Sequence, residues 1–227
     1  NTADIAANAI DGTLTKDALI ADYSDVTITA SDLIMYGDAT DSNNTKRDTV
    51  QGILDLAGGG WEFVSTTTAS GAANYQATGL AAGYDYKVTG YSVKVGTDGQ
   101  MIRFVFGTGG TPTYQTSNYS YAHDGNYGGT EAGDSGLNAS NIPFTATAPG
   151  NSTNEQGVVD ATLFNPADAS NYTHLLYTWM GVNTTPDGMA YQGGGFWEDN
   201  TAVTALKIEP ASGTISGVFK LYRRANA

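Results

Sequence analysis

From residue 61 to about 224, short runs rich in Val, Ile, Thr, Tyr and Phe recur between clusters of Gly, Asn, Asp, Ser and Pro. Such runs, with apolar and polar residues alternating, are typical of strands that bury one face. The pattern predicts strands near 61–67, 75–80, 84–95, 101–107, 117–122, 143–148, 157–164, 174–182, 189–197, 203–209 and 215–223. So many short strands in one stretch predict a mainly β fold, a jelly-roll-like two-sheet sandwich.

The clearest alternation lies in residues 84–95. Tyr84, Tyr86 and Val88 alternate with polar residues, and the parity changes after Gly90. One extra residue in a strand exchanges its two faces, so this change predicts a β-bulge near Gly90. By contrast, the polar and Gly-rich stretch 123–141 predicts a connection between sheets or a surface loop.

The first 60 residues have a different pattern. In residues 1–44 apolar residues are sparse and fit no helical or heptad period, which leaves two interpretations. One is a flexible tail, and the other is an extended arm that orders on a neighbouring copy of the chain. Residues 45–57 predict one short helix, because Thr45 and Asp48 form a box-like cap and Gly58 ends the apolar face. Gly58–Gly60 then predict a hinge. The expected organisation is therefore 1–44 arm, 45–60 helix and hinge, and 61–227 sandwich.

Composition supports a β fold and excludes several functions. Charged residues make up 15% of the 227, Gly accounts for 29, and a largely helical protein is excluded because good helix formers are scarce. The net charge of −13 disfavours binding to nucleic acid or to an anionic membrane surface. Because the chain has no Cys, disulfides and thiolate sites are excluded. No apolar run is long enough to predict a membrane span.

We find no convincing catalytic constellation and expect the chain not to be an enzyme. Gly133-Asp134-Ser135-Gly136 and the nearby His123-Asp124 are similar to protease motifs, but all lie in one Gly-rich stretch without a rigid frame. The pair Glu198-Asp199 follows Phe196-Trp197, an arrangement that can contact sugars, but a strand end followed by a surface turn is the preferred interpretation.

We expect no cofactor and no firm metal site. With two histidines, a His-based zinc or iron site is nearly excluded. The spacing of Asp38, Asp41 and Asn43 is weakly calcium-like, but the Gly and the distal Glu of an EF-hand are missing.

Aromatic residues around the polar stretch give the candidate binding site. The candidates for glycan contact are Tyr119, Tyr121, Asp124, Tyr127 and Trp197. Aromatic faces beside a carboxylate suit a sugar, and Trp197 could lie at a rim after three glycines. The competing interpretation, which we favour, is that these aromatics are core or trimer-interface residues.

Two stretches resemble fibre and other virion proteins of tailed bacteriophages. Residues 29–38 (TASDLIMYGD) with 44–57 (NTKRDTVQGILDLA) are similar to a linker that precedes distal domains in phage fibres. Residues 201–224 (TAVTALKIEPASGTISGVFKLYRR) are similar to the closing strands of phage jelly-roll domains, and Asn165-Pro166 fits that domain type. The resemblance implies a virion structural protein on the head or tail surface, usually a homotrimer, which contacts other virion proteins. It implies no catalytic residue.

Three functional hypotheses therefore remain. The first is a fibre-like virion protein that attaches by its amino-terminal arm and presents a β-sandwich for host adsorption. The second is a carbohydrate-binding module of a secreted bacterial protein. The third is a polysaccharide-degrading enzyme, which would need a pair of acids in a cleft.

Overall fold

The computed structural model describes residues 28–226 except 30, 43, 51 and 54–59. The chain divides into two units, residues 1–58 and 59–227. In the described residues, no helix has the length and apolar character needed to cross a membrane.

In the first unit the described residues form a β-hairpin. Strand β1 (Leu33–Asp38) pairs antiparallel with β2 (Asn44–Thr49), from Leu33 opposite Thr49 to Asp38 opposite Asn44. A short 3-10 turn, η1 (Ala39–Asp41), follows β1. The expected helix from residue 45 is therefore wrong at its start, since helical backbone is found only from Val50. Likewise, residues 33–38 are half of a hairpin and not a solitary extended arm, and residues 1–27 lie outside the described residues.

The physical reason is local pairing. A short helix without a packed face is marginal in water, because its costly first turn is followed by few hydrogen bonds. The stretch Leu33–Tyr36 is apolar and rich in residues that suit strands, and it lies close enough in sequence to pair with Asn44–Thr49. The cap-like pattern at Thr45 is local and carries no information about the strand Leu33–Asp38 that pairs with this segment.

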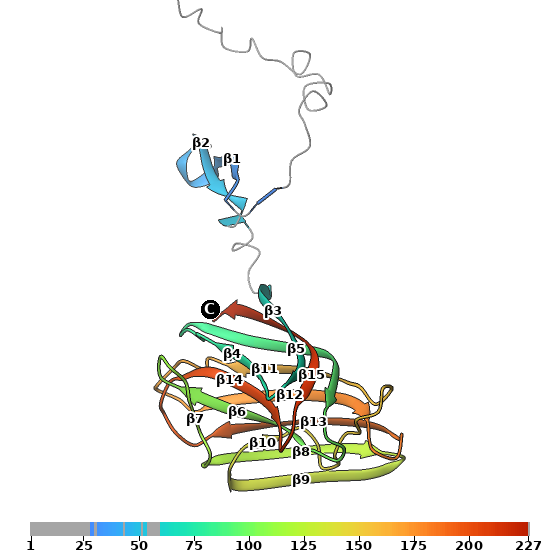
Figure 1. The fold of residues 1–227 in the computed structure, drawn as a ribbon. Helices are drawn as coiled ribbons and strands as arrows, with labels where there is room; N and C mark the ends of the chain where they lie inside the picture. The colour runs from blue at the N-terminus through green and yellow to red at the C-terminus, as the bar shows by residue number, and fades with distance from the viewer. Residues whose placement is uncertain (1–27, 30, 43, 51, 54–59, 227) are drawn as a thin grey trace, which may run out of the picture. The chain divides into compact units, whose positions relative to one another are not determined.

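The second unit is a sandwich of two antiparallel sheets (Figure 1). The large sheet has eight strands in the spatial order β3 (Glu62–Ala72), β15 (Ile215–Ala225), β5 (Tyr84–Val95), β11 (Gly157–Phe164), β12 (Thr173–Val182), β13 (Gly188–Trp197), β8 (Tyr119–Tyr127) and β9 (Thr130–Ala139). The small sheet has the order β10 (Ile142–Pro143), β6 (Ile102–Thr108), β14 (Val203–Pro210) and β4 (Tyr75–Thr78), and β7 (Thr113–Tyr114) pairs with β6. The chain is mainly β, as the sequence predicts.

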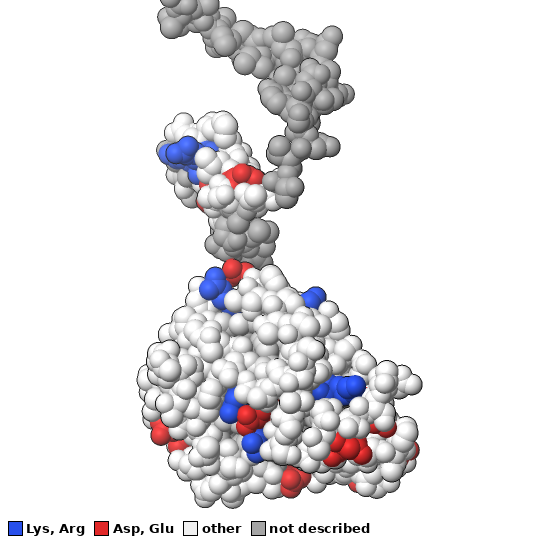
Figure 2. Space-filling model, in the orientation of Figure 1, with Lys and Arg blue, Asp and Glu red and all other residues white. Residues whose placement is uncertain are grey.

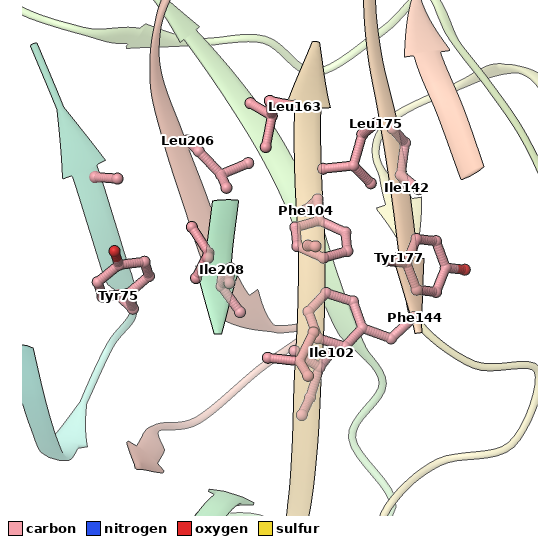
Figure 3. Packing of buried hydrophobic residues seen from close by; sticks show 14 of the residues in the cluster. Tyr75, Ile102, Phe104, Ile142, Phe144, Leu163, Leu175, Tyr177, Leu206 and Ile208 are labelled. Atoms are coloured by element: carbon pink, nitrogen blue, oxygen red, sulfur yellow. The ribbon is translucent and has the colours of Figure 1, made fainter. Parts of the chain in front are cut away.

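The core lies between the two sheets, where large side chains from both converge (Figure 3). The ring centroid of Phe104, in the small sheet, lies 4.1 Å from that of Phe144, which follows β10, and 5.4 Å from that of Tyr177, in the large sheet. Near β4, Tyr75 stacks on Phe219 of β15 with ring centroids 4.5 Å apart. Because these side chains are almost completely buried, the sandwich has a hydrophobic core of its own.

The expected bulge in β5 is confirmed. Val159 of β11 lies opposite Gly90, but Gly157 lies opposite Val93, so β5 has one extra residue here. Ser92 takes a positive φ of 52° at this point. Tyr91 therefore points outward and is 47% exposed, so it does not share the buried face of Val93 as the alternation alone suggested.

The expected loop at 123–141 is wrong. Most of this stretch forms the hairpin of β8 and β9, whose turn lies at Gly128 and Gly129. Both turn glycines have positive φ, which explains why Gly is required there. The strand signal was missed because β9 is an edge strand, mostly exposed, and does not need alternating apolar residues.

Candidate functional site: the outer face of the large sheet

The large sheet turns one face to the small sheet and the other, here called the outer face, to solvent. Along β12, Leu175, Tyr177 and Trp179 are buried, whereas Leu176 and Thr178 between them are exposed. This strict alternation assigns Thr178 to the outer face. Residues directly opposite Thr178 on neighbouring strands share that face.

A row of polar residues crosses the outer face at one level, here called the polar row. Thr178 lies opposite Asp160 of β11 and Gln192 of β13. Gln192 in turn lies opposite Asp124 of β8, and Asp160 lies opposite Thr89 of β5. Since neighbouring strands are about 4.8 Å apart, the polar row from Asp160 to Asp124 spans roughly 14 Å.

Two open hollows flank the polar row. One has a volume of about 1110 Å³ and extends toward Thr162, Leu176 and Ser135. The other has a volume of about 710 Å³ and extends toward Tyr91, Val158 and Met180. Both are lined by the same four members of the polar row, Asp160, Thr178, Gln192 and Asp124. The hollows are thus two halves of one groove across the middle of the sheet, here called the outer groove.

The polar groups of the outer groove are available to a ligand. The side chains of Thr178, Gln192 and Asp124 are exposed and have no hydrogen-bond partner within the described part of the chain. Asp160 is neutralised by Lys87, whose Nζ lies 2.7 Å from its Oδ2. The groove therefore offers a hydroxyl, an amide and one unpaired carboxylate at strand spacing.

A stack of aromatic rings lies on the same strands, four residues from the polar row. His174 of β12 lies opposite Phe164 and Phe196 on the outer face. The Phe196 ring stacks on Tyr172 at 5.9 Å with an interplanar angle of 6°, and it lies 5.4 Å from the His174 ring. Tyr172 and Phe164 remain partly exposed, so an aromatic surface adjoins the end of the groove near Leu176.

On the opposite, inner face, His123 belongs to a buried hydrogen-bond network. The Tyr177 hydroxyl donates to the Pro143 carbonyl oxygen at 2.7 Å, so it accepts from Nδ1–H of His123 at 3.0 Å. The Nε2 atom of the same ring is buried without a partner among the described residues. Burial lowers the His123 pKa, and the nearby carboxylates of Asp134 and Asp124 oppose this only partly.

The protease-like residues are not assembled. His123 lies opposite Asp134 and faces inward, whereas Ser135 lies opposite Ala122 on the outer face. Asp134 instead accepts a hydrogen bond from the Tyr121 hydroxyl at 2.9 Å, and burial together with this contact raises the Tyr121 pKa to about 12. A histidine and a serine on opposite faces of a sheet cannot form a nucleophile–base pair.

The favoured interpretation of the candidate aromatics as core residues is confirmed for Tyr119 and Trp197. Both are buried in the core, so neither can present a ring to a ligand. Tyr121 and Tyr127 pack partly against the core, on the inner face. Only Asp124 reaches the outer face, and it lines both hollows of the outer groove.

Trp197 is not at a rim, because its side chain is buried in the core although it is the last residue of β13. Its indole N–H donates to the Ser117 carbonyl at 3.1 Å. β13 ends at Trp197, and Glu198, which accepts a hydrogen bond from the Ser120 hydroxyl, directly follows the strand. The preferred interpretation of this segment as a strand end is therefore correct.

The weak calcium site gains no support. Asp38 ends β1, Asp41 ends η1, and Asn43 lies outside the described residues. Among the described residues, no group of three or more His, Asp or Glu side chains could hold a metal ion.

Most residues of the outer groove were not predicted from the sequence. Asp160, Thr178 and Gln192 lie far apart in sequence and form no motif, and only the register of four strands brings them into one row. The alternation in 173–182 could have indicated part of the groove. It places the polar Thr178 on the exposed face of a strand whose other face is apolar. The strand spacing places Asp160 and Asp124 roughly 14 Å apart along the row, which is wider than the roughly 5–9.5 Å between the carboxyl groups of glycosidase acid pairs.

Comparison with known proteins finds no match for this chain, either among protein-family models or among curated proteins.

Proposed function

We propose that this chain is a fibre-like structural protein of a bacteriophage virion, which attaches through its first unit and presents its β-sandwich at the virion surface. The observation that carries the proposal is a contrast between the two units. The sandwich buries a core of its own, whereas the hairpin leaves Leu33, Ile34, Met35 and Tyr36 between 43% and 74% exposed. The resemblance of residues 29–57 to a phage fibre linker supports the same assignment.

The exposed hairpin explains why the first unit needs partners. A two-stranded hairpin is at best marginally stable in water by itself. Leu33 and Met35 lie on one face and Ile34 and Tyr36 on the other, so both faces carry uncovered apolar side chains. We propose that other copies of the chain, in a homotrimer, and neighbouring virion proteins cover them. In this role the chain is not an enzyme and needs no cofactor.

We also infer that the sandwich is a jelly-roll variant. The chain passes repeatedly between the sheets: β3, β5 and β8 lie in the large sheet, and β4, β6 and β10 in the small one. Every pairing within both sheets is antiparallel. Such repeated crossing is typical of Greek-key and jelly-roll sandwiches.

The proposal is tested by mass in solution. The full chain should have three times the 23.6 kDa mass of one copy by native mass spectrometry, and a variant lacking residues 1–58 should be a folded monomer. Met35→Asp should dissociate the trimer, because it places a charge on a covered apolar face. Leu137→Asp is the matched control, since Leu137 is 81% exposed on edge strand β9. A full chain that stays monomeric at high concentration would contradict the proposal.

A carbohydrate-binding module is the second candidate, and the outer groove is the observation in its favour. Such a module would bind its ligand as a monomer, so the same mass measurement separates the two hypotheses.

A further inference from the structure

We propose that the outer groove binds a neutral oligosaccharide, which spans the polar row Asp160–Thr178–Gln192–Asp124. This deepens the proposed function, because it names the ligand class of the domain that the virion protein presents. It does not depend on trimer formation, since all four residues belong to one sandwich.

The groove has both polar and apolar surface, as a sugar does. Sugar rings present apolar C–H faces and hydroxyl edges. The free hydroxyl of Thr178, the amide of Gln192 and the carboxylate of Asp124 can donate to or accept from hydroxyl groups along the row. Beside them Leu176 and Met180 are 58% and 65% exposed, which provides apolar contact on either side of the row.

The charges of the groove and of the whole chain favour a neutral ligand. The two charged residues of the polar row that line the hollows, Asp124 and Asp160, are both acidic, and the chain as a whole carries −13. An anionic glycan would therefore be repelled. A cation gains little, because Asp160 is already paired with Lys87 and Asp134 accepts from Tyr121 on the inner face. Charged side chains are also sparse on the sandwich surface seen in Figure 2.

A peptide strand is a poorer occupant than a glycan. Peptides gain much of their affinity for sheets by adding a strand to a free edge. The polar row lies on β11, β12, β13 and β8, each of which is paired on both sides. The backbone beneath the groove is thus already hydrogen-bonded, and only side chains are available for recognition.

The test measures binding by the full chain to neutral oligosaccharides of glucose, galactose, mannose and N-acetylglucosamine, with galacturonic-acid and sialylated oligosaccharides as acidic comparators. We expect saturable binding to at least one neutral oligosaccharide and none to the acidic ones. Thr178→Val and Gln192→Ala should each weaken binding by about 2- to 10-fold, since each removes one hydrogen bond. Both residues are exposed, so the variants should unfold at the same urea concentration as the parent.

Thr66→Val is the matched control. Thr66 is exposed on the same face, opposite Lys220 of β15, but it lines neither hollow. It should leave affinity unchanged. The proposal is overturned if no neutral oligosaccharide binds, if an acidic one binds better, or if Thr178→Val and Gln192→Ala bind like Thr66→Val. It is also overturned if Gln192→Ala dissociates the oligomer, because the groove would then be a subunit interface. A monomeric chain that still binds through Thr178 would refute the trimer and leave this inference intact.

Discussion

Replacing Gly193 by Ala should destabilise the sandwich, because there is no room for a methyl group between β13 and β8. A Cβ atom at Gly193 would lie 2.4 Å from Cβ of His123, 2.7 Å from the Ala122 carbonyl oxygen and 2.9 Å from Cα of His123. Carbon atoms in contact are normally about 3.5–4.0 Å apart. These neighbours are backbone or directly attached to it, so no side-chain rotation can relieve the contact.

The expected cost follows from this geometry. Overpacking a core position costs about 1–3 kcal/mol, and rigid neighbours place Gly193→Ala toward the upper end, about 2–3 kcal/mol. For a domain of this size, that corresponds to a melting temperature lower by about 4–12 °C. The reduced entropy of the unfolded chain offsets only about 0.4–1 kcal/mol of the cost.

Urea unfolding followed by tryptophan fluorescence measures the effect as a lower midpoint at unchanged slope. Gly188→Ala is the matched control, because Gly188 begins the same strand and a Cβ there would meet nothing within 4 Å. It should be neutral or stabilising by about 0.4–1 kcal/mol. If Gly193→Ala unfolds at the parent's midpoint, the close approach of β13 to β8 is wrong. If both variants lose stability equally, the steric reasoning fails.

Two further predictions concern the buried His123. Because burial holds the His123 pKa below its ordinary value, the unfolded chain binds a proton that the folded chain does not, so stability should fall as pH drops below about 6.5. His123→Gln should flatten the pH dependence of the urea midpoint between pH 5 and 7, whereas His174→Gln, which changes an exposed ring, should preserve it; equal slopes in the two variants would contradict the assignment. Tyr177→Phe should cost about 1–3 kcal/mol in the same assay, since it leaves the buried Nδ1–H of His123 and the Pro143 carbonyl without this partner, and a midpoint like the parent's would count against the network.

Much of the sandwich could be predicted from the sequence, because strands with one buried face carry a period of two. The expected strand at 84–95 has the observed bounds, and the strands expected at 157–164 and 174–182 agree with the structure to within one residue. The bulge after Gly90 was visible for the same reason, since an extra residue exchanges the two faces. The prediction of strands from alternation failed where neither face of a strand is fully buried, as in β9.

Only the tertiary structure decided which residues meet. Tyr119 contacts Phe106 of the small sheet and Trp197 belongs to the same buried cluster, and no local pattern distinguishes these positions from a rim. Residues 45–49 pair with 33–38 in a hairpin and do not begin the expected helix, because a strand depends on its partner and not on its own residues alone. The outer groove exists because the registers of β11, β12, β13 and β8 align Asp160, Thr178, Gln192 and Asp124. A single sequence determines which side chains alternate along each strand, but the alignment between strands is a property of the folded sheet.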